Sequence, residues 1–115
     1  MAPLLTYLRF LNFIHALDGD TNAPQMDLDA HKLLEVISVK QSQGNPLTVT
    51  DAMALQHIAS PATIHRKLDQ LRELGMIDTV FEGKNRRTKY LVPTQKAHDF
   101  FEKLGEAMHK ALASN

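Results

Sequence analysis

The chain of 115 residues contains no cysteine. Disulfides, cysteine-ligated iron–sulfur clusters and thiol nucleophiles are therefore excluded, and a reducing compartment, the cytoplasm, is the expected location. The sequence also shows no nucleophile elbow, no glycine-rich phosphate loop and no zinc-protease helix. Each of these motifs places a reacting group by its spacing, so we expect neither an enzyme nor a cofactor.

Net charge is absent too, because 13 Lys and Arg balance 13 Asp and Glu. This balance argues against a uniformly basic nucleic-acid binder. The distribution is uneven, however: residues 1–64 hold three basic and six acidic side chains, whereas residues 65–89 hold seven and four. Positive charge is thus concentrated in one segment, as expected for a local contact surface for an anion.

No long uninterrupted apolar run is present. The N-terminal segment MAPLLTYLRFLNFIHAL is apolar, but Arg9, Asn12 and His15 interrupt it and no basic leader precedes it. It predicts neither a signal peptide nor a membrane span, and no membrane partner is expected. The length fits one domain, residues 1–115, with one core.

Apolar spacing predicts a helix over residues 3–17, apolar over most of its circumference. After a polar linker that ends near Pro24, Asp27 is the expected N-cap of a second helix, which ends before the Gly44-Asn45-Pro46 break. Its expected inward face consists of Ala30, Leu33, Leu34 and Ile37.

Residues 47–49 are typical of a short extended piece, and Thr50 is the expected cap of a brief helix. Ser60-Pro61 then predicts a strong helix start, because serine accepts a hydrogen bond from a free amide and proline occupies the first turn without losing one. Ile64, Leu68 and Leu71 predict the buried face of this helix, and Gly75 its C-cap.

Residues 76–81 and 90–92 predict two strands with Gly83 in the turn. A last helix is expected over residues 94–112. The side chains that it is expected to bury are Ala97, Phe100, Phe101, Leu104, Met108 and Ala111. The predicted fold is therefore mainly α with a small β-hairpin: a winged helix-turn-helix core over residues 27–93 between terminal helices 1–17 and 94–112.

The segments SPATIHRKLDQLRELGMI and GKNRRTKYLVPTQKA resemble the DNA-binding half of the MarR family of bacterial transcriptional regulators, over roughly residues 28–100. The resemblance implies a base-reading helix whose contacts are Ser60, Ala62, Thr63, Arg66 and Lys67. It also implies a basic wing. Asn85 stands at the wing tip where the family usually has an acid that supports the following arginine.

Helical spacing agrees with this placement of the reading face. With the apolar side chains inward, the opposite face presents polar groups suited to base edges and phosphates, with His65 at its margin. The predicted contacts of this face are Thr63, His65, Arg66, Lys67 and Gln70. A solvated polar helix face is the alternative.

The predicted wing carries four cations within six residues, Lys84, Arg86, Arg87 and Lys89, with Asn85 among them. Arg86 and Arg87 suit a narrow minor groove, while Lys84 and Lys89 suit phosphates. The alternative is an edge hairpin that its cations protect from aggregation.

The terminal helices are expected to form a two-fold interface, since the first is apolar on too many sides for one monomer. Its expected residues are Leu4, Leu8, Leu11, Ile14, Phe100, Phe101, Leu104 and Met108. The expected partners are double-stranded DNA, a second copy of the chain and an unnamed small-molecule effector. A winged helix that binds proteins within a larger assembly is the rival interpretation.

Two patterns in the sequence resemble metal sites. Residues 18–29 resemble the start of a calcium loop, but Ala23 replaces the required glycine and Asp29 is short for bidentate coordination. His98 and His109 have a spacing known from zinc-sensing winged-helix repressors of the ArsR type, yet Lys96 and Leu112 stand where other ligands would be needed. No metal is therefore expected.

Overall fold

Helices and strands of the chain form two compact units in the computed structural model, which describes residues 2–18, 25–84 and 86–113. One unit is Gln25–Ala97; the other combines Met1–Pro24 with His98–Asn115. The elements are α1 (Pro3–Asp18), α2 (Leu28–Ser42), α3 (Val49–Met53), α4 (Pro61–Glu73), β1 (Ile77–Phe81), β2 (Lys89–Pro93) and α5 (Gln95–Ala113). Residues 19–24, which are half of the calcium-like loop, and Asn85 lie outside the described residues. One domain over residues 1–115 stays a prediction.

Local caps determine where the helices of the 25–97 unit begin. Asp27 accepts a hydrogen bond from the Ala30 N–H at 2.9 Å, and Ser60 accepts one from the Thr63 N–H at 3.3 Å. Both caps were predicted, and both satisfy amides that the first turn leaves unpaired. They fix the register of α2 and α4, whose inward faces are then buried.

The expected cap of α3 was wrong. Thr48, not Thr50, begins this helix: its hydroxyl accepts from the Asp51 N–H at 3.1 Å, and the Asp51 carboxylate accepts from the Thr48 N–H at 3.0 Å. This reciprocal capping box satisfies two amides at once, which a cap at Thr50 could not do. The extended piece is correspondingly shorter, and Thr48 forms an isolated bridge with Tyr90.

The core of the 25–97 unit places α4 against α2, and both against the hairpin. The largest fully buried side chains are Leu33, Leu34, Ile37, Ile64, Leu68, Leu71, Met76 and Leu91. Three of these side chains belong to α4, and Ile64, Leu68 and Leu71 fix its inward face in the core. Its outward face is left for other contacts.

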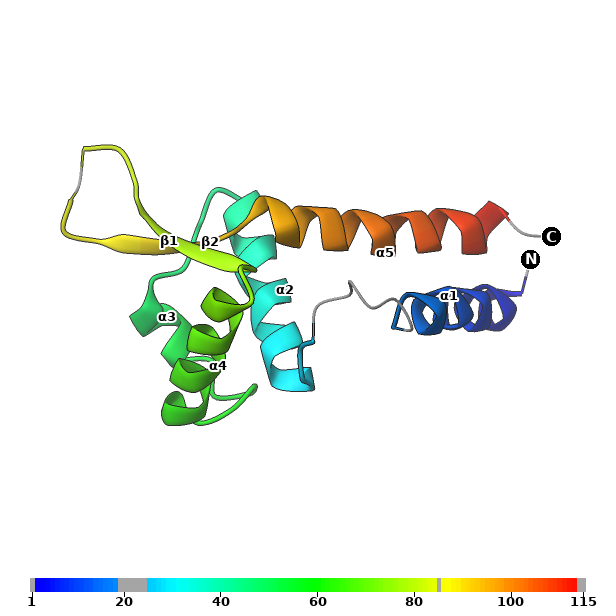
Figure 1. Cartoon of the computed structure of the whole chain (residues 1–115), viewed down its shortest axis with the longest axis horizontal. Coiled ribbons are helices and arrows are strands. Elements are labelled where there is room, and N and C mark those ends of the chain that lie inside the picture. The colour runs from blue at the N-terminus through cyan, green and yellow to red at the C-terminus, as the bar shows by residue number, and fades with distance from the viewer. Residues whose placement is uncertain (1, 19–24, 85, 114–115) are drawn as a thin grey trace. The chain divides into compact units, whose positions relative to one another are not determined.

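The hairpin follows α4 directly and pairs antiparallel from Ile77 opposite Pro93 to Phe81 opposite Lys89. Gly75 ends α4 with φ +74°, a left-handed conformation that favours glycine. Lys96 donates from Nζ to the Leu74 carbonyl at 2.7 Å and so joins the start of α5 to the end of α4. The far end of the hairpin extends beyond α2, α3 and α4 (Figure 1).

In the other unit, the first half of α1 and the C-terminal end of α5 line an apolar groove of about 520 Å³. Its walls are Pro3, Thr6, Tyr7, Phe10, Met108, Ala111 and Leu112. The predicted burial of Met108 is wrong: this side chain is 54% exposed, while the neighbouring Ala107 is buried. Successive helix residues point about 100° apart, so Met108 lies outside the covered face that includes Ala107.

No described helix is both long and apolar enough to cross a membrane.

Candidate nucleic-acid interface

The N-terminal half of α4 presents the polar face that the sequence predicts. Ile64 and Leu68 point inward and are fully buried, whereas Ala62, His65 and Arg66 are exposed. Ser60 and Gln70 are exposed as well, and Thr63 and Lys67 are half-buried. The exposed members of the predicted contact set therefore lie away from the core, whereas Thr63 and Lys67 are partly covered.

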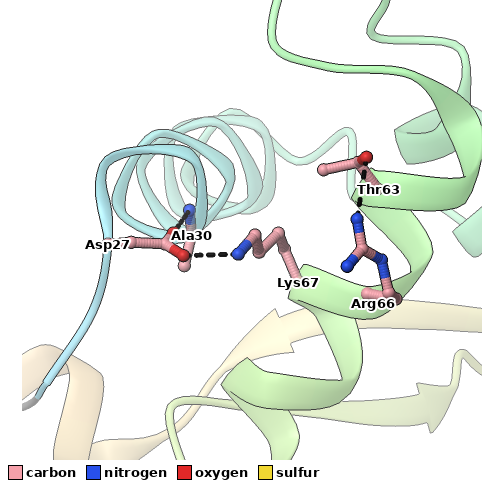
Figure 2. A network of polar contacts seen from close by, with 5 residues as sticks. All are labelled: Asp27, Ala30, Thr63, Arg66 and Lys67. Atoms are coloured by element: carbon pink, nitrogen blue, oxygen red, sulfur yellow. Dashed lines mark hydrogen bonds and ion pairs between the residues drawn. The ribbon is translucent and has the colours of Figure 1, made fainter.

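A chain of three side chains organises the exposed start of α4. The Ser60 hydroxyl donates to Thr63 Oγ1 at 3.1 Å, and Arg66 Nη2 donates to the same oxygen at 3.2 Å. Figure 2 shows the Arg66 guanidinium drawn toward Thr63, one turn nearer the helix start. A guanidinium held in this way loses little entropy when it forms a bidentate bond with a base edge.

Lys67 follows Arg66 in sequence but points elsewhere. Its Nζ forms an ion pair with the Asp27 carboxylate at the start of α2 (Figure 2). The Lys67 side chain is only 16% exposed, against 49% for Asp27. The bond from Lys67, and then the bond from the Ala30 N–H, hold the pKa of the Asp27 carboxyl below its ordinary value. Asp27 is therefore a full carboxylate at neutral pH.

The C-terminal half of α4 carries an acid on its exposed face. Asp69 lies 3.5 Å from His65 Nδ1 and 3.0 Å from Arg72 Nη1. Such exposed pairs contribute well under about 1 kcal/mol each to stability, but they give His65 and Arg72 an acidic partner within α4. The half of α4 best suited to an anionic partner is thus the N-terminal one.

Two of the four hairpin cations lie over one aromatic ring. Lys84, Arg86, Arg87 and Lys89 are all exposed. The Arg86 guanidinium carbon lies 5.6 Å from the centroid of the Phe81 ring, and Lys89 Nζ lies 5.5 Å from it. Sequence reasoning treated Phe81 only as a strand residue. The signal that could have revealed it was the hairpin register, which sets Phe81 opposite Lys89.

The terminal helices leave much of their apolar surface uncovered. Of the predicted interface residues, Leu4, Leu8 and Met108 are 67%, 49% and 54% exposed, while Leu11, Ile14, Phe100, Phe101 and Leu104 are half-buried. Leu5, Tyr7 and Leu112 are also more than half exposed and were missed.

Among the described residues, no three His, Asp or Glu side chains are grouped closely enough to hold a metal ion.

Solved structures share this arrangement of helices and hairpin. A MarR-like transcriptional regulator from Thermotoga maritima matches with a TM-score of 0.64 at 13% identity, over 97% of this chain and 79% of its own. FabT of Streptococcus pneumoniae, solved in complex with DNA, matches with a TM-score of 0.59 at 18% identity, over 95% and 71%.

The chain has the fold of MarR-like transcriptional regulators. A further structure with this fold is Bordetella bronchiseptica BpsR, whose DNA binding is regulated by 6-hydroxynicotinic acid. It matches with a TM-score of 0.54 at 13% identity, over 93% of this chain and 71% of its own. No protein-family model and no curated protein matches the sequence. At these identities the likeness concerns the MarR-like fold, and function rests on the chain's own residues.

Proposed function

We propose that this protein binds double-stranded DNA sequence-specifically and acts as a small bacterial transcriptional regulator in the cytoplasm, without catalysis. One observation carries the proposal: a buried helix face fixes α4 so that its Ser60, Thr63 and Arg66 chain is exposed in the same unit as the cationic hairpin. An ordered guanidinium suits base edges, and exposed cations suit phosphates. FabT, which shares the fold, was solved with DNA.

Within this proposal the two surfaces have separate tasks. The start of α4, with Ser60, Ala62, Thr63, Arg66 and Gln70, enters a major groove, and His65 lies at the edge of this contact. The hairpin cations reach the neighbouring backbone and minor groove. Affinity then comes mainly from the hairpin, and discrimination between sequences mainly from α4.

Substitutions at Thr63 and Arg66 test the recognition helix. Arg66→Ala should reduce the preference for a selected site over random duplex DNA by about 1–3 kcal/mol, the value of one bidentate base contact. Thr63→Val should act in the same direction because it removes the oxygen that orients Arg66, whereas Thr63→Ser keeps that oxygen and should keep the preference. The measurement is titration of both DNAs at fixed salt, after selection of a bound site from random sequences.

Arg72→Ala is the matched control, since Arg72 lies in the last turn of α4 and pairs with Asp69. It should leave the preference unchanged. If Arg66→Ala kept the full preference for the selected site over random duplex DNA, base reading would belong to another surface of the protein. A wild-type protein that binds no duplex even at low salt would instead favour the rival function, a winged helix that binds proteins, which the zero net charge also suits.

The terminal helices are proposed to form the homodimer. Leu4 and Leu8 are exposed apolar side chains of α1, and Met108 is exposed at the apolar groove between α1 and α5. Sedimentation should therefore show a dimer at micromolar concentration, and Leu8→Glu should shift it toward monomer by placing a charge in the interface. Asn12→Glu adds the same single charge at an exposed polar position of α1 and should leave the dimer intact. A wild-type monomer at this concentration would refute the interface.

Regulation by a small molecule completes the proposal. Its support is the BpsR structure, in which the fold is combined with control of DNA binding by 6-hydroxynicotinic acid.

A further inference from the structure

Lys67 differs from Arg66, Arg86 and Lys89 in what it contacts. Arg66 is bonded within its own helix, to Thr63, and the hairpin cations Arg86 and Lys89 lie over an aromatic ring of their own hairpin. Lys67 instead spans from α4 to the N-cap of α2, a residue 40 positions earlier in the sequence. This bond links two elements of the core.

The environment of Asp27 favours its ion pair with Lys67. Its carboxylate is already ordered, because it accepts from the Ala30 N–H at 2.9 Å as the cap of α2. The Lys67 side chain is largely covered, so its ammonium group is directed at Asp27 rather than at solvent. A DNA phosphate that binds Lys67 must either displace this carboxylate or lie beside it, and in both cases the negative charge of Asp27 repels the phosphate.

We propose that Asp27 is a built-in competitor of DNA for Lys67. The ion pair makes Lys67 a positioning residue, which ties the start of α4 to α2, and it keeps one cation out of the phosphate contacts. Sequence-independent affinity is thereby limited, while Arg66 next to it stays available for bases. This inference rests on the proposed DNA-binding function.

The competition has a measurable consequence in salt dependence. Each phosphate neutralised by a protein cation contributes about 0.9 to the slope of log K on log salt concentration. Asp27→Asn removes the competing charge but keeps a good N-cap, because asparagine caps helices as well as aspartate does. Lys67 then becomes a phosphate contact, and the slope for random duplex DNA should steepen by about 0.9. This corresponds to an affinity about eightfold higher at 0.1 M salt if affinities are equal at 1 M.

Two further variants make the test specific. Asp27→Asn combined with Lys67→Met removes both charges and keeps the apolar stem of the lysine, so its slope should equal that of the wild type. Asp29→Asn removes the same charge from the first turn of α2 and should also leave the slope unchanged. Thermal unfolding of each variant checks that the fold is retained.

The inference fails if Asp27→Asn has the wild-type slope, or if the double variant has a slope about 0.9 flatter than the wild type, because Lys67 would then contact DNA in the native protein. Failure of the underlying function has a different signature. In that case the wild type itself shows no salt-dependent binding to duplex DNA.

Discussion

Leu68→Ala is expected to destabilise the 25–97 unit by about 2–5 kcal/mol, the usual cost of emptying a fully buried leucine site. Leu68 is 1% exposed and lies between Ile64 and Leu71 on the inward face of α4, which packs against α2 and α3. A cavity at this position loosens α4 from the core, so DNA binding should weaken at temperatures where the wild type is folded. Chemical denaturation gives the free energy of unfolding.

Gln70→Ala is the control on the outward face of the same helix. Because Gln70 is exposed, its replacement should change the free energy of unfolding by no more than about 0.5 kcal/mol. If Leu68→Ala had an equally small effect, α4 would not be anchored by this face. The proposed orientation of Arg66 would then lose its foundation.

Replacing Arg86 and Arg87 together by alanine is expected to have the largest effect on DNA affinity. Loss of two cationic contacts should flatten the slope of log K on log salt by about 1.8. Affinity at 0.1 M salt should fall about sixtyfold if the two proteins are equal at 1 M. The measurement is titration of one duplex over a series of salt concentrations.

Arg86→Lys with Arg87→Lys keeps both charges and should retain most of the slope, which separates charge from folding of the hairpin. A slope that does not change in the alanine variant would exclude contact between the hairpin and DNA. Both arginines are exposed, so neither substitution empties the core.

Phe81 gives the hairpin a support that sequence comparison did not identify. The MarR family, which the sequence resembles, usually has an acid beside the wing arginine. This chain has Asn85 there, which lies outside the described residues. The Arg86 guanidinium instead lies over the Phe81 ring. An aromatic face attracts a cation without neutralising it, so Arg86 keeps its full charge for an anionic partner.

Sequence reasoning succeeded where structure depends on near neighbours. The caps at Asp27 and Ser60, the glycine after α4 and the inward stripe of Ile64, Leu68 and Leu71 all follow from rules that span a few residues. It failed for α3, where Thr48 and Thr50 both suit a cap and the position of Asp51 decided between them. It also failed for Met108, since helical spacing does not say how wide the covered stripe is.

The sequence by itself therefore determined the order of elements, the starts of α2 and α4 and the concentration of positive charge in residues 65–89. Only the tertiary structure decided what the individual cations contact. Spacing placed Arg66 and Lys67 side by side on one face, yet Arg66 is held by Thr63 within α4 and Lys67 by Asp27 of α2. The physical reason is that Asp27 comes within reach only when α2 packs against α4, a contact between distant segments that no local pattern encodes.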